Sequence, residues 1–172
     1  MAGISLAQRD LVETRTQLTA WFGQRLGGEV LLSDLRTANA ASGWSSESLV
    51  FSAGADEYVI RIPPTGGGIF DEYDLAGQTR TQELLHGYGI ATPAPIHYEP
   101  DSAWIGSRFM VMPRISGHTH SDMTYAGRGW LHDAGPSVQR RLHDDFLDTL
   151  VTLQRVPVAE APWLDVDDVA WR

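Results

Sequence analysis

Apolar residues recur at near-helical spacing in the first part of the chain. They are Leu11, Leu18, Phe22 and Leu26. Charged and polar residues fill most of the positions between them, which is typical of a helix with one face against a core. The pattern predicts a helix that begins near Ser5 and closes at Gly27-Gly28, because glycine commonly ends helices.

Short apolar runs follow, and they favour strands. Residues 29–35 predict one strand. Residues 48–51 and 58–62 flank a turn-like segment at 54–57, so we expect them to form a hairpin. Pro63-Pro64 ends the second run, since proline has no N–H to donate to a neighbouring strand.

The middle of the chain returns to a helical pattern and then to strands. A helix is expected over residues 71–86, ended by Gly87 and Gly89. Its buried candidates are Leu75, Leu84 and Leu85. Two further strands are expected over residues 94–98 and 108–115, separated by a turn at Glu99-Pro100-Asp101.

The last third begins with a polar segment rich in glycine and histidine, residues 117–135, which we expect to be a long connection. A helix should start near Pro136-Ser137. Its apolar stripe consists of Leu142, Phe146, Leu150 and Leu153. The order of elements predicts an α+β protein in which an antiparallel sheet carries a helix on one face.

Composition excludes several classes of function. The 172 residues include 13 Lys+Arg and 22 Asp+Glu, so the formal net charge is −9, which argues against non-specific nucleic-acid binding. There is no cysteine, which excludes disulfides, thiolate zinc sites and cysteine nucleophiles. No uncharged run approaches a membrane span, and the first residues lack the pattern of a signal peptide. We therefore expect a cytoplasmic protein with no membrane partner.

Three motifs suggest chemistry but have simpler interpretations. Gly66-Gly67-Gly68 lacks the following Gly-Lys-Ser/Thr of a phosphate-binding Walker loop, so a connector is the better interpretation. His118-Thr119-His120 has no defined carboxylate partner for a metal, and we expect no metal site. His143-Asp144-Asp145 lies between apolar positions of the last helix with no asparagine after it, so we interpret it as the polar face of that helix.

Residues 43–51 carry a more informative pattern, in which a turn of small residues leads directly into an apolar strand. The strand that follows carries a cation, Arg61. Kinase-type folds hold ATP with backbone amides of such a turn and one positive side chain from the adjacent strand. The alternative interpretation is that Arg61 is a solvated strand residue.

Four segments in this order resemble the aminoglycoside phosphotransferase-like, or kinase-like, family, in the branch related to the kinase-like domain found beside some acyl-CoA dehydrogenases. They are residues 43–51, 58–64, 87–95 and 106–117, within a resemblance that spans roughly residues 25–155. The resemblance implies a protein-kinase-like N-lobe, an antiparallel five-stranded sheet with one packed helix, over residues 29–116. An N-terminal helix would precede it over residues 1–28, and a linker with the first helix of an incomplete C-lobe would follow over residues 117–172.

The resemblance also implies roles for individual residues in binding ATP or GTP. Ser45 and Ser46 would form the nucleotide-positioning turn. Arg61 stands where the family has its phosphate-binding lysine, and Gln78 falls about where a helix glutamate would pair with that lysine. Arginine and glutamine in place of the family's lysine and glutamate remove an ion pair, although arginine can still bind phosphate through two parallel hydrogen bonds.

The resemblance places the hinge between the two lobes at residues 112–115. Adenine would be held there by the carbonyl of Pro113 and the N–H of Ile115, beside Met112. Proline at 113 is harmless, since only its carbonyl is required.

The family's catalytic loop, a His-Gly-Asp sequence with a later asparagine and a Mg²⁺-binding aspartate, is not found in these 172 residues. We therefore expect an N-terminal or truncated portion of an ATP-dependent phosphotransferase of small hydroxylated molecules, with the Mg²⁺ ligands and catalytic residues elsewhere. The alternative is a non-catalytic kinase-like binding module that acts through self-association or a partner chain.

Overall fold

The computed structural model describes residues 9–27, 31–38, 46–64, 73–118 and 129–164. The chain forms two compact units. The first combines Met1–Glu83 with Pro93–Arg114, and the second combines Leu84–Thr92 with Ile115–Arg172. The glycine run at 66–68 and the serine at 45 lie outside the described residues.

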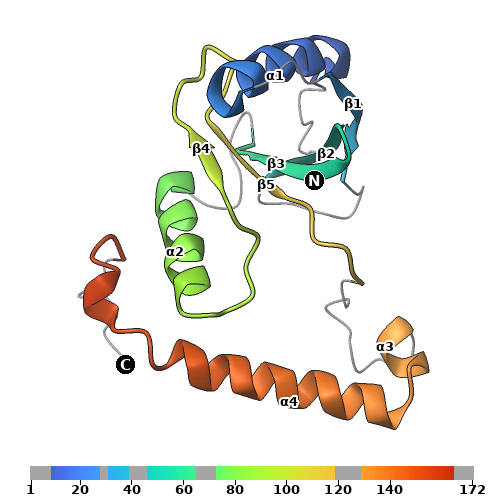
Figure 1. Cartoon of the computed structure of the whole chain (residues 1–172), viewed down its shortest axis with the longest axis vertical. Coiled ribbons are helices and arrows are strands. Elements are labelled where there is room, and N and C mark those ends of the chain that lie inside the picture. The colour runs from blue at the N-terminus through green and yellow to red at the C-terminus, as the bar shows by residue number, and fades with distance from the viewer. Residues whose placement is uncertain (1–8, 28–30, 39–45, 65–72, 119–128, 165–172) are drawn as a thin grey trace, which may run out of the picture. The chain divides into compact units, whose positions relative to one another are not determined.

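A five-stranded antiparallel sheet forms the centre of the first unit (Figure 1). Its strands are β1 (Leu32–Thr37), β2 (Glu47–Ala53), β3 (Asp56–Ile62), β4 (His97–Glu99) and β5 (Phe109–Pro113). They lie in the order β1-β2-β3-β5-β4. The predicted kinase-like sheet is therefore confirmed.

The expected hairpin is also confirmed, but its strands are longer than the apolar runs. β2 and β3 pair continuously from Glu47↔Ile62 to Ala53↔Asp56, and only Gly54-Ala55 remain as the turn. Gly54 has φ 65°, a conformation that glycine adopts without the steric cost of a Cβ. The expected turn over residues 54–57 was too long, because the charged residues Asp56 and Glu57 are part of β3 and their backbone pairs with β2.

The remaining strands differ from the predicted ranges. β1 is shifted toward the C-terminus of the expected 29–35 and has an irregular register between Ser33 and Arg36, with Asp34 at φ 55°. β4 is only three residues long, compared with the expected 94–98. The prolines at 93 and 95 explain this, because a proline cannot donate a ladder hydrogen bond. β5 is likewise shorter than the expected 108–115.

Helix α1 (Leu11–Leu26) begins later than the expected start near Ser5, which lies outside the described residues. The Asp10 side chain caps it by accepting hydrogen bonds from the backbone N–H groups of Val12 and Glu13, at 2.8 and 3.1 Å. An aspartate at this position satisfies helix donors that have no partner within the helix. Gly27, at φ 82°, ends the helix as predicted.

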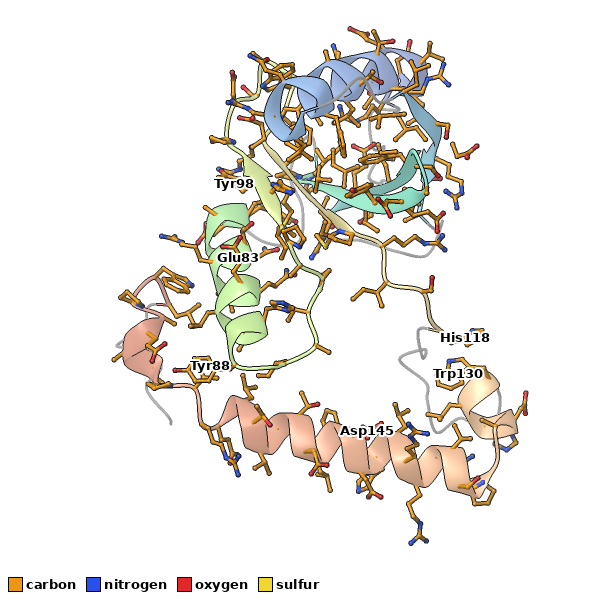
Figure 2. The ribbon with its side chains drawn as sticks, viewed as in Figure 1. Glu83, Tyr88, Tyr98, His118, Trp130 and Asp145 are labelled. Atoms are coloured by element: carbon orange, nitrogen blue, oxygen red, sulfur yellow. The ribbon has the colours of Figure 1, made fainter. Side chains whose placement is uncertain are left out.

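The two faces of the sheet carry separate apolar clusters. On one face, side chains of α1 pack against alternate sheet residues, among them Leu49, Ile60 and Phe109. On the other face, Leu75 packs with Met110, Met112 and Ile96, and with the partly buried Val59 and Tyr98 (Figure 2). Because successive strand residues point to opposite faces, the two clusters divide the sheet cleanly.

Leu75 is the first residue of helix α2 (Leu75–Gly87), which starts four residues after the expected Asp71. Leu75 is buried as predicted, whereas Leu84 and Leu85 are only half-buried. The chain leaves the helix through Gly89, at φ 79°. The residues of α2 up to Glu83 belong to the first unit, and its last turn belongs to the second.

The second unit contains α3 (Trp130–Asp133), α4 (Pro136–Leu153) and the short 3-10 helix η1 (Val158–Glu160). The predicted helix start near Pro136 is confirmed. His143, Asp144 and Asp145 are exposed on α4, as are its apolar side chains, so their interpretation as its polar face stays a prediction; Asp145 is labelled in Figure 2. The Tyr88 hydroxyl donates to Glu160 at 2.6 Å, and this bond is the main cause of the raised pKa of Tyr88.

Helix α4 has no buried residue. Its apolar side chains are all at least one third exposed, among them Leu142, Phe146, Leu150 and Leu153. Within the described part of the chain, no helix is long and apolar enough to cross a membrane.

Candidate functional site

Arg61 lies near the end of β3 and projects from the α2-side face of the sheet. Its neighbours along the strand, Ile60 and Ile62, belong to the apolar cluster under α1, so Arg61 points to the opposite face together with Val59. Across the ladder it stands opposite Ser48 on β2 and Met110 on β5. The side chain is half-buried.

Arg61 and Ser46, which sequence reasoning placed in one site, do come together. The Arg61 Nη2 donates to the Ser46 Oγ at 3.2 Å. Ser46 precedes the first residue of β2 and is only 6% exposed. Ser45, the other member of the predicted turn, lies outside the described residues.

Gln78 lies on α2, half-buried, and its backbone N–H donates to the Asp74 carbonyl at 3.0 Å. Among the described residues, the side chain of Arg61 forms its hydrogen bond with Ser46 and not with Gln78. The structure therefore does not pair Arg61 with the helix residue that the resemblance indicated.

Among the described residues Arg61 contacts no carboxylate, whereas three other arginines of the first unit do. Arg9 pairs with Glu47 at 2.9 Å, Arg25 with Glu99 at 2.9 Å, and Arg114 with Glu57 at 2.6 Å. Within the described segments Arg61 has no ion pair.

The hinge residues lie at the end of β5. Met112 is 7% exposed in the cluster with Leu75, and Pro113 stands opposite Tyr58. The Arg114 N–H donates to the Glu57 carbonyl at 2.8 Å, so Glu57 and Arg114 are a hydrogen-bonded pair of the β3–β5 ladder, next to the pair of Tyr58 and Pro113.

Hydrogen-bonded and non-bonded pairs alternate along an antiparallel ladder, so Pro113 directs its backbone carbonyl away from β3. On that side β5 has β4 beside it, but β4 pairs only with Phe109, Met110 and Val111. The Pro113 carbonyl therefore points past the end of β4 and is not used in the ladder. Ile115, the first residue of the second unit after Arg114, has a side chain that is 64% exposed.

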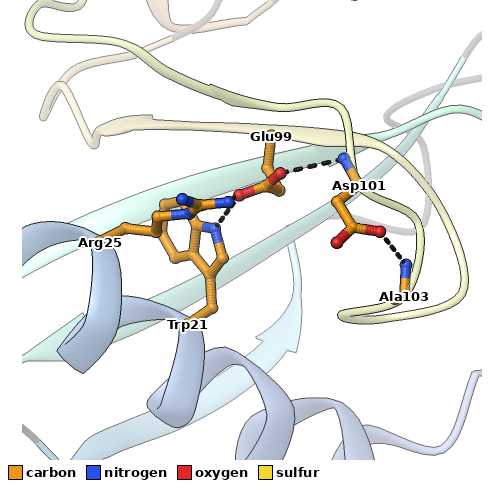
Figure 3. Close-up of polar contacts among 5 residues, drawn as sticks. All are labelled: Trp21, Arg25, Glu99, Asp101 and Ala103. Carbon is orange, nitrogen blue, oxygen red and sulfur yellow. Dashed lines mark hydrogen bonds and ion pairs between the residues drawn. The ribbon is translucent and has the colours of Figure 1, made fainter.

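A second polar cluster, which sequence reasoning missed, surrounds Glu99 (Figure 3). One oxygen of its 2%-exposed carboxylate accepts from Trp21 Nε1 and Arg25 Nε, both at 2.9 Å, and the other accepts from the Asp101 N–H at 3.0 Å. Burial by itself would raise the pKa of Glu99, but the bonds from Asp101, Trp21 and Arg25 outweigh burial and lower it. The sequence showed only a turn at 99–101, because contacts between α1 and β4 leave no periodic signal.

These contacts satisfy the acceptor groups of Glu99 and link α1 to β4, so we assign the cluster a structural role. Of the His118-Thr119-His120 motif, only His118 is among the described residues. The His118 ring lies 5.5 Å from the Trp130 ring, and the described residues contain no group of three or more potential metal ligands (Figure 2).

The family model described as "Phosphotransferase enzyme family" matches residues 37–171. The chain belongs to this family. Two of the candidate nucleotide-binding residues of this phosphotransferase family member, Arg61 and Ser46, lie on the α2-side face of the sheet. The others, Met112, Pro113 and Ile115, lie at or just after the end of β5. All 13 basic residues of the sequence, Arg61 among them, are arginines.

Curated relatives include Acyl-CoA dehydrogenase family member 11 from several vertebrates. The human protein is 29% identical over 143 residues, which cover 82% of this chain and 18% of the relative. The rat protein is 25% identical over 161 residues, covering 87% and 20%. The chain thus spans about a fifth of the length of the curated relatives it matches.

Proposed function

We propose that this chain is the nucleotide-binding portion of an ATP-dependent phosphotransferase that acts on a hydroxyl group of a small molecule. The observation that carries the proposal is Arg61. It is half-buried on the α2-side face, hydrogen-bonded to the neutral Ser46, and without a carboxylate among the described residues. A cation held in this way suits a polyphosphate ligand. Membership of the phosphotransferase family favours a nucleotide as that ligand.

In the proposed complex, the guanidinium of Arg61 binds the nucleotide phosphates through two parallel N–H donors. The Pro113 carbonyl and the Ile115 N–H receive the base, which would be adenine or guanine. Met112 and Val59 supply apolar surface on the same face as Arg61. The positioning of phosphates by fixed charges is the main catalytic contribution in phosphoryl transfer.

Phosphotransferases of this family use Mg²⁺ to neutralise charge on the transferred phosphoryl group. The described residues include no cluster of His, Cys, Asp or Glu that fits a metal ion. We therefore assign no step to Mg²⁺ on this chain.

Helix α4 favours a second candidate function, a non-catalytic binding module of the same fold. Its exposed apolar side chains, such as Phe146 at 58%, form a surface that suits a second copy of the chain or a partner chain. Nucleotide binding distinguishes the two candidates, since a module that acts only by association does not require it.

Titration of ATP with Mg²⁺ into wild type and Arg61→Ala tests the first proposal. We expect Arg61→Ala to weaken binding by roughly ten- to a hundredfold, which is the loss of one charge-assisted phosphate contact. Arg36→Ala is the matched control, because Arg36 is an exposed arginine on β1. A folded Arg61→Ala variant that binds ATP as tightly as wild type would show that the phosphate site is not on β3.

A further inference from the structure

The contact between Ser46 and Arg61 joins a cation to a neutral group. Arg9 and Arg114 are instead held by carboxylates, which fix the guanidinium and also neutralise it. Ser46 offers a neutral hydroxyl oxygen instead, at 3.2 Å from Arg61 Nη2. Its bond can fix the orientation of the side chain while leaving the full positive charge for a ligand.

The geometry of the guanidinium makes one such bond effective. The group is planar and rigid, with five N–H donors in a fixed fork, so fixing one donor restricts the plane of all the others. With one Nη2 hydrogen directed at Ser46, four N–H donors have no hydrogen-bond partner among the described residues and are left for phosphate oxygens. A lysine ammonium, which rotates freely about its terminal bond, would gain less from the same hydroxyl.

The position of Ser46 suits this role. It is 6% exposed, so water competes poorly for its hydroxyl. The next residue, Glu47, pairs with Arg9, whose Nη1 also donates to the Ile105 carbonyl at 2.7 Å. Glu47 is therefore committed to Arg9, and no other carboxylate among the described residues forms an ion pair with Arg61.

We propose that Ser46 is a positioning residue that holds the Arg61 guanidinium for phosphate binding, the task that the resemblance would give to the helix residue Gln78. This inference rests on the proposed function. It differs from the sequence prediction, in which Ser46 acts as part of a turn that contacts the nucleotide directly.

The test compares the dissociation constant of ATP with Mg²⁺ across variants at Ser46. The variants are Ser46→Val and Ser46→Thr. Valine and threonine side chains have nearly the same shape, but only threonine keeps the hydroxyl. We expect Ser46→Val to bind about tenfold more weakly, the value of one hydrogen bond to a charged group, and Ser46→Thr to bind within about twofold of wild type. Ser52→Ala is the control, because Ser52 is a half-buried serine on the same strand that stands opposite Glu57, away from Arg61.

A double-mutant cycle separates positioning from direct contact. In an Arg61→Ala background, Ser46→Val should cause no further loss, because its effect passes through Arg61. An equal loss in both backgrounds, or equal affinities of the valine and threonine variants, would overturn the inference. Unchanged affinity of Arg61→Ala itself would instead overturn the proposed function. Thermal unfolding confirms that each variant is folded.

Discussion

The Glu99 carboxylate stays charged although it is almost completely buried, because three hydrogen-bond donors converge on it. Its folded-state pKa therefore lies below its ordinary value of 4.5. A lowered carboxyl pKa contributes stability above the unfolded-state value, and this contribution is lost as the pH falls through the folded-state value. We expect the free energy of unfolding to fall as the pH drops below about 4.5.

Glu99→Gln tests the source of that dependence. The amide turns one acceptor into a donor that faces other donors, so we expect a loss of about 1–3 kcal/mol in the free energy of unfolding at pH 7. The variant should also lose part of the acid dependence between pH 7 and pH 4. Urea unfolding at both pH values measures this, with Glu13→Gln as the control on the exposed face of α1. Equal acid dependence in Glu99→Gln and wild type would contradict the assignment.

At Arg61 the absence of lysine from the sequence allows a chemical test. Arg61→Lys keeps the charge but loses the fork, so we expect a smaller loss of ATP affinity than for Arg61→Ala. The substitution also introduces the sole side-chain amine among these 172 residues. ATP should protect this amine from an amine-reactive reagent, as measured by mass spectrometry of the labelled peptide. Labelling that ATP does not slow would argue against phosphate binding at β3.

Individual residues explain which elements the sequence predicted well. The hairpin, α2 and α4 were predicted because their apolar periodicity is strong and because glycine or proline marks their ends. The start of α1 and the length of β4 were predicted less well. The start of α1 is fixed by Asp10, whose side chain caps the helix. β4 is short because the prolines before it have no N–H to donate to the neighbouring strand.

The candidate site was only partly predictable for a similar reason. A strand arginine and a serine before the preceding strand were visible in the sequence, but their contact depends on the β2–β3 register, which the turn sets. The family resemblance suggested Gln78 as the partner of Arg61, whereas among the described residues Arg61 forms its side-chain hydrogen bond with Ser46. The polar contacts of Glu99 join segments 74 and 78 residues apart, and no local pattern encodes them.

Helix α4 carries its own prediction, since it exposes an apolar stripe and has arginines at 140 and 141 before aspartates at 144, 145 and 148. Two antiparallel copies would bring the basic half of each helix beside the acidic half of the other. We expect self-association in sedimentation experiments, reduced by Phe146→Glu but not by Ser137→Glu on the polar side. A monomer at all concentrations would count against this face as a contact between copies.

For the whole chain, the main expectation is that it binds a nucleotide without catalysing phosphoryl transfer. The sequence carries the candidate nucleotide residues but no His-Gly-Asp loop with its later asparagine and aspartate. We expect purified residues 1–172 to bind ATP but to transfer no phosphoryl group to hydroxyl acceptors, as measured with γ-labelled ATP. Turnover that depends on Arg61 would show that catalytic residues are present in this chain.

The ladder geometry at Pro113 has a consequence for the choice of nucleobase. A proline at this position presents its carbonyl oxygen as an acceptor on the open side of β5 and contributes no N–H of its own. The exocyclic amine of adenine is a donor and matches this acceptor, whereas the oxygen at the same ring position of guanine would face it as a second acceptor. Under the proposed function, GTP should therefore compete for the site more weakly than ATP, and equal competition would show that the base does not contact the Pro113 carbonyl.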